Sequence, residues 1–237
     1  MGEQYEVLAL EARGKVGQSK SFREEEGNKH PFRVMRDGAL AMAPWKQALV
    51  FEGRCYQVTV GTFSTPVTGG GAGTILDQDQ PELIIDIPSA RAIMLMHVRA
   101  DCQLPLLAAD SEEAEILLAI DRLAVTGATA TQGTVETPVN MRTDLVGGSG
   151  LVVVSAVTTN TTAVPTMSME LAHPVKIGDV QGTAANAMWN GLFLDYEPEA
   201  SPVIVGPAAV LLYWGGTVAT TGFASVTWAE FVRSETI

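Results

Sequence analysis

From residue 55 onward the sequence breaks into short apolar segments rich in Val, Ile and Thr and separated by turn residues. The clearest lie at residues 83–87 (LIIDI), 92–98 (AIMLMHV) and 151–159 (LVVVSAVTT), with others at 55–62, 203–205, 208–214 and 223–232. β-Branched and aromatic residues in this arrangement are typical of strands in a sandwich or barrel. The sequence lacks the strand–helix alternation of a Rossmann or TIM-barrel enzyme. We therefore predict an all-β, antiparallel sandwich for residues 55–237.

Three segments of this body are less clear. Residues 115–125 (EILLAIDRLAV) have helical spacing, but we favour a strand because the surrounding sequence is β-rich. Residues 167–177 alternate partly and contain Pro174, which suits an edge strand or a bend. Residues 184–195 fit a short helical turn followed by a strand.

Residues 1–54 differ from the body, and we predict that they form an extended N-terminal arm or small subdomain. Glycines interrupt a charged stretch in this segment, and its apolar pieces are too short to build a core. Isolated apolar side chains are spaced as an extended chain needs them to fill separate pockets on a partner. The predicted docking residues are Phe22, Phe32, Val34, Met35 and Trp45.

Charge is distributed unevenly between the two parts. Residues 1–54 hold nine Lys or Arg against eight Asp or Glu, whereas residues 55–237 hold six against nineteen. An acidic body argues against binding to nucleic acid or to an anionic membrane, because both need clustered Lys and Arg. The first residues do not read as a secretory signal, and no apolar run is long enough to span a bilayer. We expect a soluble protein made in a cytoplasm.

Several sequence patterns invite a catalytic or ligand-binding interpretation, and each has a simpler one. Residues 69–74 (GGGAGT) lack the Lys of a phosphate-binding loop and fit a surface loop. Asp77, Asp79, Glu82 and Asp86 lack the spacing of an EF-hand and fit a solvated loop, and residues 110–113 (DSEE) fit a surface turn. No nucleophile elbow or zinc-protease motif occurs. We predict no catalytic residues, no metal and no cofactor.

The cysteines and the C-terminal aromatic residues both have core interpretations. Cys55 and Cys102 fit two buried thiols better than a disulfide, because a reducing compartment disfavours bridges. The aromatic residues near the C-terminus are interleaved with Val, Leu and Ala, which favours core positions over a sugar-stacking surface. They are Trp189, Phe193, Tyr213, Trp214, Trp228 and Phe231.

Residues 209–232 (AVLLYWGGTVATTGFASVTWAEFV) resemble the closing strands of jelly-roll virion proteins of tailed bacteriophages. The likeness rests on the Gly-rich turn between two apolar strands and on the small-residue strand that ends in Trp-Ala-Glu-Phe. An arm before an acidic β body is similar to head decoration and minor capsid proteins. The resemblance implies a jelly-roll fold and a virion location. It also implies partners, namely the major capsid protein and copies of the chain itself, often as a trimer.

Two further classes of function fit a sandwich of this kind. One is a carbohydrate-binding β-sandwich of a fibre or adhesin, which an exposed aromatic platform beside polar side chains would favour. The other is a hydrolase with a jelly-roll core, which a cleft with two inward carboxylates would favour. Hydrophobic residues make up 46% of the chain. Charged residues make up 18%, whereas typical domains have about 25%. The shortage of charge favours a surface that another subunit covers, and therefore a homo-oligomeric structural protein.

Overall fold

The computed structural model describes ten stretches of the chain, which fall into two compact units, Met1–Glu52 and Gly53–Ile237. The described residues are 12–16, 24–30, 44–69, 76–103, 112–122, 133–145, 147–158, 165–178, 191–216 and 220–235.

In the first unit the described residues form a two-stranded antiparallel sheet and one short helix. Strand β1 (Ala12–Val16) pairs with β2 (Glu24–His30), and the register shifts between Gly14 and Val16. Helix α1 (Trp45–Phe51) starts after Pro44, whose φ of −53° suits a helix start, and ends before Gly53 at φ 73°. The sequence did not predict the strand pair or the helix.

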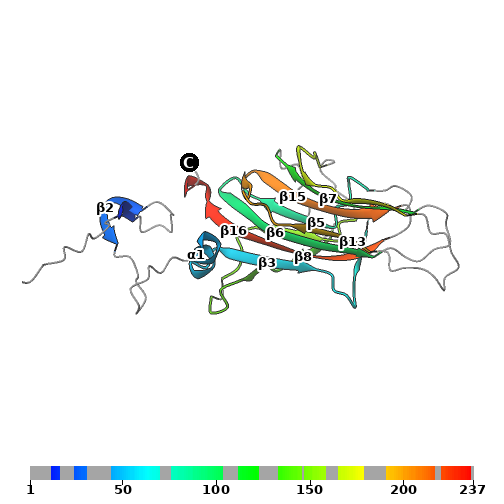
Figure 1. Ribbon diagram of the computed structural model, residues 1–237, viewed down its shortest axis with the longest axis horizontal. Helices are drawn as coiled ribbons and strands as arrows, with labels where there is room; N and C mark the ends of the chain where they lie inside the picture. The colour runs from blue at the N-terminus through cyan, green and yellow to red at the C-terminus, as the bar shows by residue number, and fades with distance from the viewer. Residues whose placement is uncertain are drawn as a thin grey trace, which may run out of the picture. The chain divides into compact units, whose positions relative to one another are not determined.

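The second unit contains two antiparallel sheets packed as a sandwich, which confirms the predicted fold class (Figure 1). The first sheet has the order β13-β6-β16-β3-β9, with β14 beside β6 and β4 beside β16. Its strands are β3 (Cys55–Val60), β4 (Val67–Thr68), β6 (Arg91–Gln103), β9 (Val139–Asn140), β13 (Gly191–Tyr196), β14 (Val203–Val205) and β16 (Thr221–Val232).

The second sheet has the order β11-β7-β15-β5-β10-β8, with β12 also beside β7. Its strands are β5 (Leu83–Ile87), β7 (Glu112–Asp121), β8 (Thr134–Glu136), β10 (Val152–Ser155), β11 (Met169–Ala172), β12 (Val175–Gly178) and β15 (Ala208–Gly216).

The pairings are nested, as in a long hairpin that has been rolled up. Strand β3 pairs with β16, β5 with β15, β6 with β13 and β14, and β7 with β11 and β12. The pairings of β3 with β16 and of β6 with β13 and β14 lie in the first sheet. Those of β5 with β15 and of β7 with β11 and β12 lie in the second. This is the strand order of a jelly roll. Strands β8, β9 and β10 are an insertion, which extends the second sheet beyond β5 and the first beyond β3.

The main core lies between the sheets and follows the alternation of the strands. On β15, Val210, Leu212 and Trp214 point inward, and on β16, Val226 and Trp228 face them. Trp214 and Trp228 are the largest buried side chains among the described residues, at 1% and 0% exposure. They supply much of the apolar area that drives the sheets together.

Strand β6 is long, and a β-bulge within it shifts the alternation of its inward side chains. Thr227 of β16 pairs with His97, but the next residue, Trp228, pairs with Leu95, so Met96 is an extra residue on β6. The inward positions are therefore Ile93 and Leu95 before the bulge and Val98, Ala100 and Cys102 after it. The apolar run predicted for residues 92–98 is one half of a strand that continues to Gln103.

The second sheet is apolar on its outer face as well. A separate cluster of buried side chains lies there, formed by Ile84, Leu117, Ala119, Val154, Val157, Ala209, Leu211 and Tyr213. Leu76 packs against this cluster, and the Tyr213 hydroxyl donates to the carbonyl oxygen of Gln78 at 3.1 Å. Residues of β15 are consequently buried whichever way they point.

Two buried carboxylates tie strands to their neighbours through backbone N–H groups. Glu82 is 2% exposed and accepts a hydrogen bond from the backbone N–H of Trp214 at 2.8 Å. Glu230 accepts from the indole N–H of Trp228 at 3.1 Å, from Gly150 N–H at 3.0 Å and from the Ser149 hydroxyl. Because buried polar groups need hydrogen-bond partners, the contacts of Glu230 hold residues 149–151 against β16.

Other predicted strands are confirmed, some of them with changed bounds. Residues 83–87 and 203–205 match β5 and β14, and residues 115–125 are strand β7, as favoured, although the strand spans Glu112–Asp121. The strand predicted at 151–159 is β10, which covers only Val152–Ser155 because Ala156 turns to φ 49°. The segment 167–177 divides at His173 and Pro174 into β11 and β12. The helical turn expected within residues 184–195 falls largely outside the described residues.

Leu211 and Leu212 are neighbours on β15 that test whether both faces of the second sheet are buried. Leu211 lies in the outer cluster and Leu212 in the main core, at 0% and 1% exposure. We expect Leu211→Ala and Leu212→Ala each to lower the free energy of unfolding by about 2–5 kcal/mol in urea denaturation followed by Trp fluorescence. Val152→Ala, at a side chain 50% exposed, is the control and should cost less than about 1 kcal/mol. A cost for Leu211→Ala as small as the control's would contradict a buried outer face.

Candidate functional site

The predicted docking residues of the arm stay a prediction. Phe22, Phe32, Val34 and Met35 lie outside the described residues. Trp45 is on α1 and is 47% exposed, with the Lys46 ammonium 5.8 Å from its ring centroid.

The acidic patterns considered in the sequence are partly structural. Asp77 caps a turn by accepting from the backbone N–H of Asp79 at 3.0 Å, but Glu82 is buried, so the prediction of a wholly solvated loop is wrong. Glu112 and Glu113 pair with Gly178 and Ile177 as part of β7, and the predicted surface turn is wrong there. No group of three or more His, Cys, Asp or Glu in the described part of the chain is arranged to hold a metal ion.

Both cysteines are buried thiols, as predicted. The Cys55 thiol lies 3.7 Å from the Met96 sulfur. Burial raises the pKa of Cys102 to about 11, so almost none of its thiolate is present at neutral pH.

The aromatic residues near the C-terminus divide into two groups. Tyr213, Trp214, Trp228 and Phe231 are at most 4% exposed, which confirms their predicted core positions. Phe193 is 67% exposed, so the core prediction is wrong for it, because odd-numbered residues of β13 point outward. Trp189 lies outside the described residues.

Phe193 belongs to a small aromatic pocket at one end of the first sheet. Phe193 and Phe223 both pair in register with Asp101 of β6, one on each side, and Phe63 is a third aromatic lining residue, 75% exposed. Gln103 adds an amide and Asp101 a carboxylate, the latter 3.1 Å from Arg99. This aromatic pocket combines flat apolar faces with hydrogen-bonding groups.

A larger groove runs along the edge of the sandwich where β14 of the first sheet lies near β7 and β11 of the second. We call it the edge groove. Its lining residues are Ile120, Arg122, Met169, residues 202–208 and Arg233, and its volume is about 540 Å³. Val203, Val205 and Met169 are 50%, 40% and 47% exposed, so the walls of the groove present apolar surface to solvent.

Local sequence determines the shape of the edge groove. Strand β14 is a three-residue edge strand between Pro202 and Pro207, and proline ends strands because it has no N–H to donate. A side chain at Gly206 would collide with the carbonyl oxygen of Pro88, so the close approach requires glycine. The Arg233 guanidinium donates to the carbonyl oxygens of Ser89 and Gly206 at 3.4 and 3.3 Å, which anchors a positive charge at the rim.

Arg122 supplies a second positive charge to the edge groove. Its backbone N–H donates to the Ser168 hydroxyl at 3.3 Å, while the residue as a whole is exposed. Only six Lys or Arg occur in residues 55–237, and two of them line this one groove. An apolar floor with guanidinium groups at its rim suits a ligand that is apolar and carries carboxylates.

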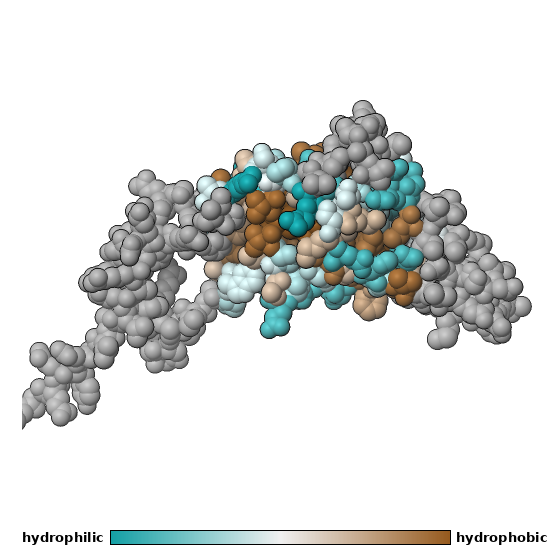
Figure 2. Space-filling model, turned by 90° about the horizontal axis from the view of Figure 1, so that it is seen from above, coloured by the Kyte–Doolittle hydropathy of each residue, from teal (hydrophilic) through white to brown (hydrophobic). Residues whose placement is uncertain are grey.

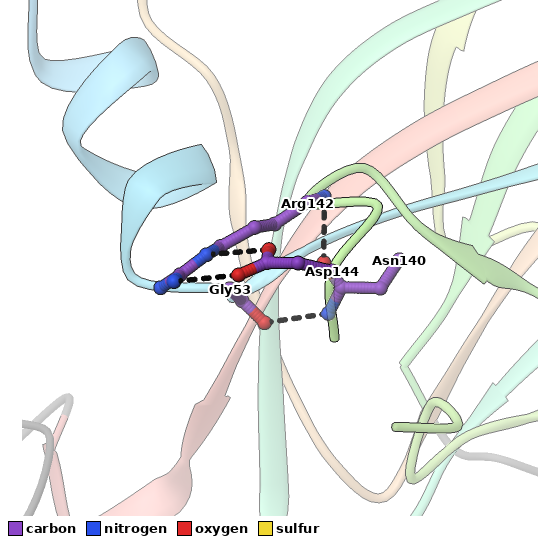
Figure 3. A network of polar contacts seen from close by, with 4 residues as sticks. All are labelled: Gly53, Asn140, Arg142 and Asp144. Carbon is purple, nitrogen blue, oxygen red and sulfur yellow. Dashed lines mark hydrogen bonds and ion pairs between the residues drawn. The ribbon is translucent and has the colours of Figure 1, made fainter. Parts of the chain in front are cut away.

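The first residues of the second unit are held by a polar clamp shown in Figure 3. The Asn140 amide donates to the carbonyl oxygen of Gly53 at 2.8 Å, and its oxygen accepts from the backbone N–H of Arg142 at 2.8 Å. Arg142 makes a bidentate pair with Asp144, both contacts at 2.9 Å, and this pair lowers the pKa of Asp144. The clamp fixes the start of β3 against the insertion.

Exposed apolar side chains also occur within the insertion, each at least 39% exposed, at Val135, Val139, Met141, Leu145 and Val152. Figure 2 shows apolar residues reaching the surface in several patches among polar ones. Sequence reasoning missed both this set and the edge groove. The two prolines around residues 203–205 were the available signal for an exposed edge.

Within the described residues, no helix is long and apolar enough to cross a lipid bilayer. Comparison with family models, with curated proteins and with solved structures gives no match for this chain.

A substitution at Asn140 tests whether the polar clamp stabilises the fold. Asn140→Ala should lower the free energy of unfolding by about 1–3 kcal/mol, because the Gly53 carbonyl and the Arg142 N–H lose a partner in a site where Asn140 itself is 5% exposed. Arg142→Ala removes the exposed ion pair with Asp144 but keeps the backbone N–H that bonds to Asn140, and it should have a much smaller effect in the same thermal melts. Equal, small effects of the two substitutions would contradict the clamp.

The two thiols should be unreactive in the native protein. Both are at most 2% exposed, and the pKa of Cys102 is about 11. We expect a thiol reagent such as DTNB to modify neither cysteine over an hour at pH 8, and to modify both at once in 6 M guanidinium chloride. Fast reaction of one thiol in the native protein would show that its strand opens readily.

Proposed function

We propose that this protein is a structural subunit that assembles with copies of itself and coats a larger protein surface. The most specific form of this proposal is a head decoration or cement protein of a tailed-phage virion. Its partners would be the major capsid protein and two further copies in a trimer. The protein would be made in the host cytoplasm and would act without a cofactor or catalysis.

The observation that carries the proposal is the pattern of exposed apolar residues on a body that otherwise buries its core well. Strand β15 is buried along its whole length, whereas the edge groove and the insertion leave Val, Met and Leu side chains 39–66% exposed. A chain with only 18% charged residues has few charges to cover such surface. Exposed apolar side chains that line a groove are candidates for an interaction site.

Two further points support the virion role. The jelly-roll strand order is common in capsid proteins, an analogy at the level of fold. The resemblance of residues 209–232 to closing strands of phage virion proteins points in the same direction. Assembly would be driven by burial of apolar area, worth about 25 cal/mol per Å² before the costs of association.

The mass of the assembled protein tests this proposal. Sedimentation equilibrium or native mass spectrometry of the full chain at about 1–100 µM should show a homo-oligomer, with a trimer as the expected species. A monomer over this whole range that also fails to bind purified phage shells would contradict the proposal.

A carbohydrate-binding role is the second candidate, and the aromatic pocket is the specific observation that favours it. Phe63 and Phe193 are exposed beside Asp101 and Gln103, and sugar rings stack on such faces while their hydroxyls bond to polar groups.

A glycan-array screen of the full chain tests this second role. Any glycan that binds should lose at least about tenfold in affinity with Phe193→Ala. Phe51→Ala, at another exposed phenylalanine, is the control. The absence of any bound glycan would remove this candidate.

A further inference from the structure

The edge groove combines an apolar lining with two positive charges on a body that is otherwise acidic. Its floor is formed by Ile120, Ile204 and Ala208, its exposed walls by Met169 and Val203, and its charged groups are two arginines. In the single chain the wall side chains are about half exposed, which leaves the groove accessible to a segment of another molecule.

The first unit contains one stretch whose chemistry is complementary to that groove. Residues 1–12 (MGEQYEVLALEA) contain three glutamates, Glu3, Glu6 and Glu11, and no Lys or Arg. Residues 13–52, in contrast, hold eight Lys or Arg and five Asp or Glu. The charge of the arm is therefore divided into an acidic, apolar start and a basic remainder.

We propose that residues 3–11 of one copy bind in the edge groove of a second copy. In an extended segment Tyr5, Val7 and Ala9 share one face, which would cover the floor and walls. Glu3 and Glu11 lie on the same face and would meet the two arginines of the groove. This inference rests on the proposed self-assembly and names the contact that produces it.

Strand β14 adds a main-chain component to this contact. It pairs with β6 alone among the described strands, and it spans only three residues. An extended segment laid beside such an edge gains backbone hydrogen bonds, while alternate side chains enter the groove.

The geometry also constrains the assembly. An arm that enters the groove of a neighbour makes a head-to-tail contact, and repeated contacts of this kind close into a ring or a reciprocal dimer. The charged part of the contact is exposed, so association should weaken as ionic strength rises.

A charge-reversal pair tests the contact on the full chain. One variant is Arg122→Glu, and the other carries Glu3→Lys, Glu6→Lys and Glu11→Lys together. Each variant alone should self-associate at least about tenfold more weakly than the wild type in sedimentation velocity. An equimolar mixture should recover part of the association, because each reversed group faces its opposite charge wherever unlike variants meet. In a mixed trimer two of the three contacts are of this kind. Arg99→Glu, at an exposed arginine of the first sheet, is the control and should behave like the wild type.

Each other outcome has a definite meaning. If the wild type associates and both variants associate equally well, the groove is not the contact, although self-assembly stands. If both variants are weakened but the mixture does not recover, the arm and the groove do not meet between copies. If the wild type itself stays monomeric, this inference fails, and the proposed function fails with it only if the chain also does not bind purified phage shells. Trp fluorescence verifies folding, and Val203→Asp replaces Arg122→Glu if the latter does not fold.

Discussion

In both sheets a strand from the C-terminal end of the chain lies between two strands from earlier in the sequence. Strand β15 lies between β7 and β5, and β16 lies between β6 and β3, with antiparallel pairing throughout. These two strands also carry Trp214 and Trp228, the largest core side chains described. Since neither sheet is continuous without its C-terminal strand, no part of the body can bury its core before the chain's ends meet. Such pairing is non-local, and slow, cooperative folding is its usual consequence.

The same arrangement determines which surfaces remain for partners. The second sheet is covered on both faces, because an outer apolar cluster lies opposite the main core. The outer face of the first sheet carries polar side chains such as Gln57, Thr59 and Arg99. Apolar residues therefore reach the surface mainly at the edges and one end of the sandwich, where β14, the insertion and Phe193 lie. A protein that exposes its edges is suited to side-by-side association, and the edges are where we place its contacts.

The sequence predicted the fold class and most strands, because alternation and turn spacing are local properties. It failed where a local pattern is interrupted or where burial depends on distant residues. The bulge at Met96 shifts the alternation of β6, so one long strand read as a short one. Glu82 was predicted in a solvated loop, and nothing was predicted for the Glu230 side chain. Each is buried by contacts with residues far along the chain, Trp214 for Glu82 and Gly150 for Glu230. The edge groove brings together residues from 120 to 233, and no single segment of the sequence indicates it.

Hydrogen–deuterium exchange of the full chain at two concentrations reports both whether the chain associates and where. If it assembles through these edges, raising the concentration from about 1 to 100 µM slows exchange in β14 and β11 and in residues 3–11. Exchange in the buried centres of β15 and β16 should not change. An exchange profile that is the same at both concentrations would contradict assembly through these edges.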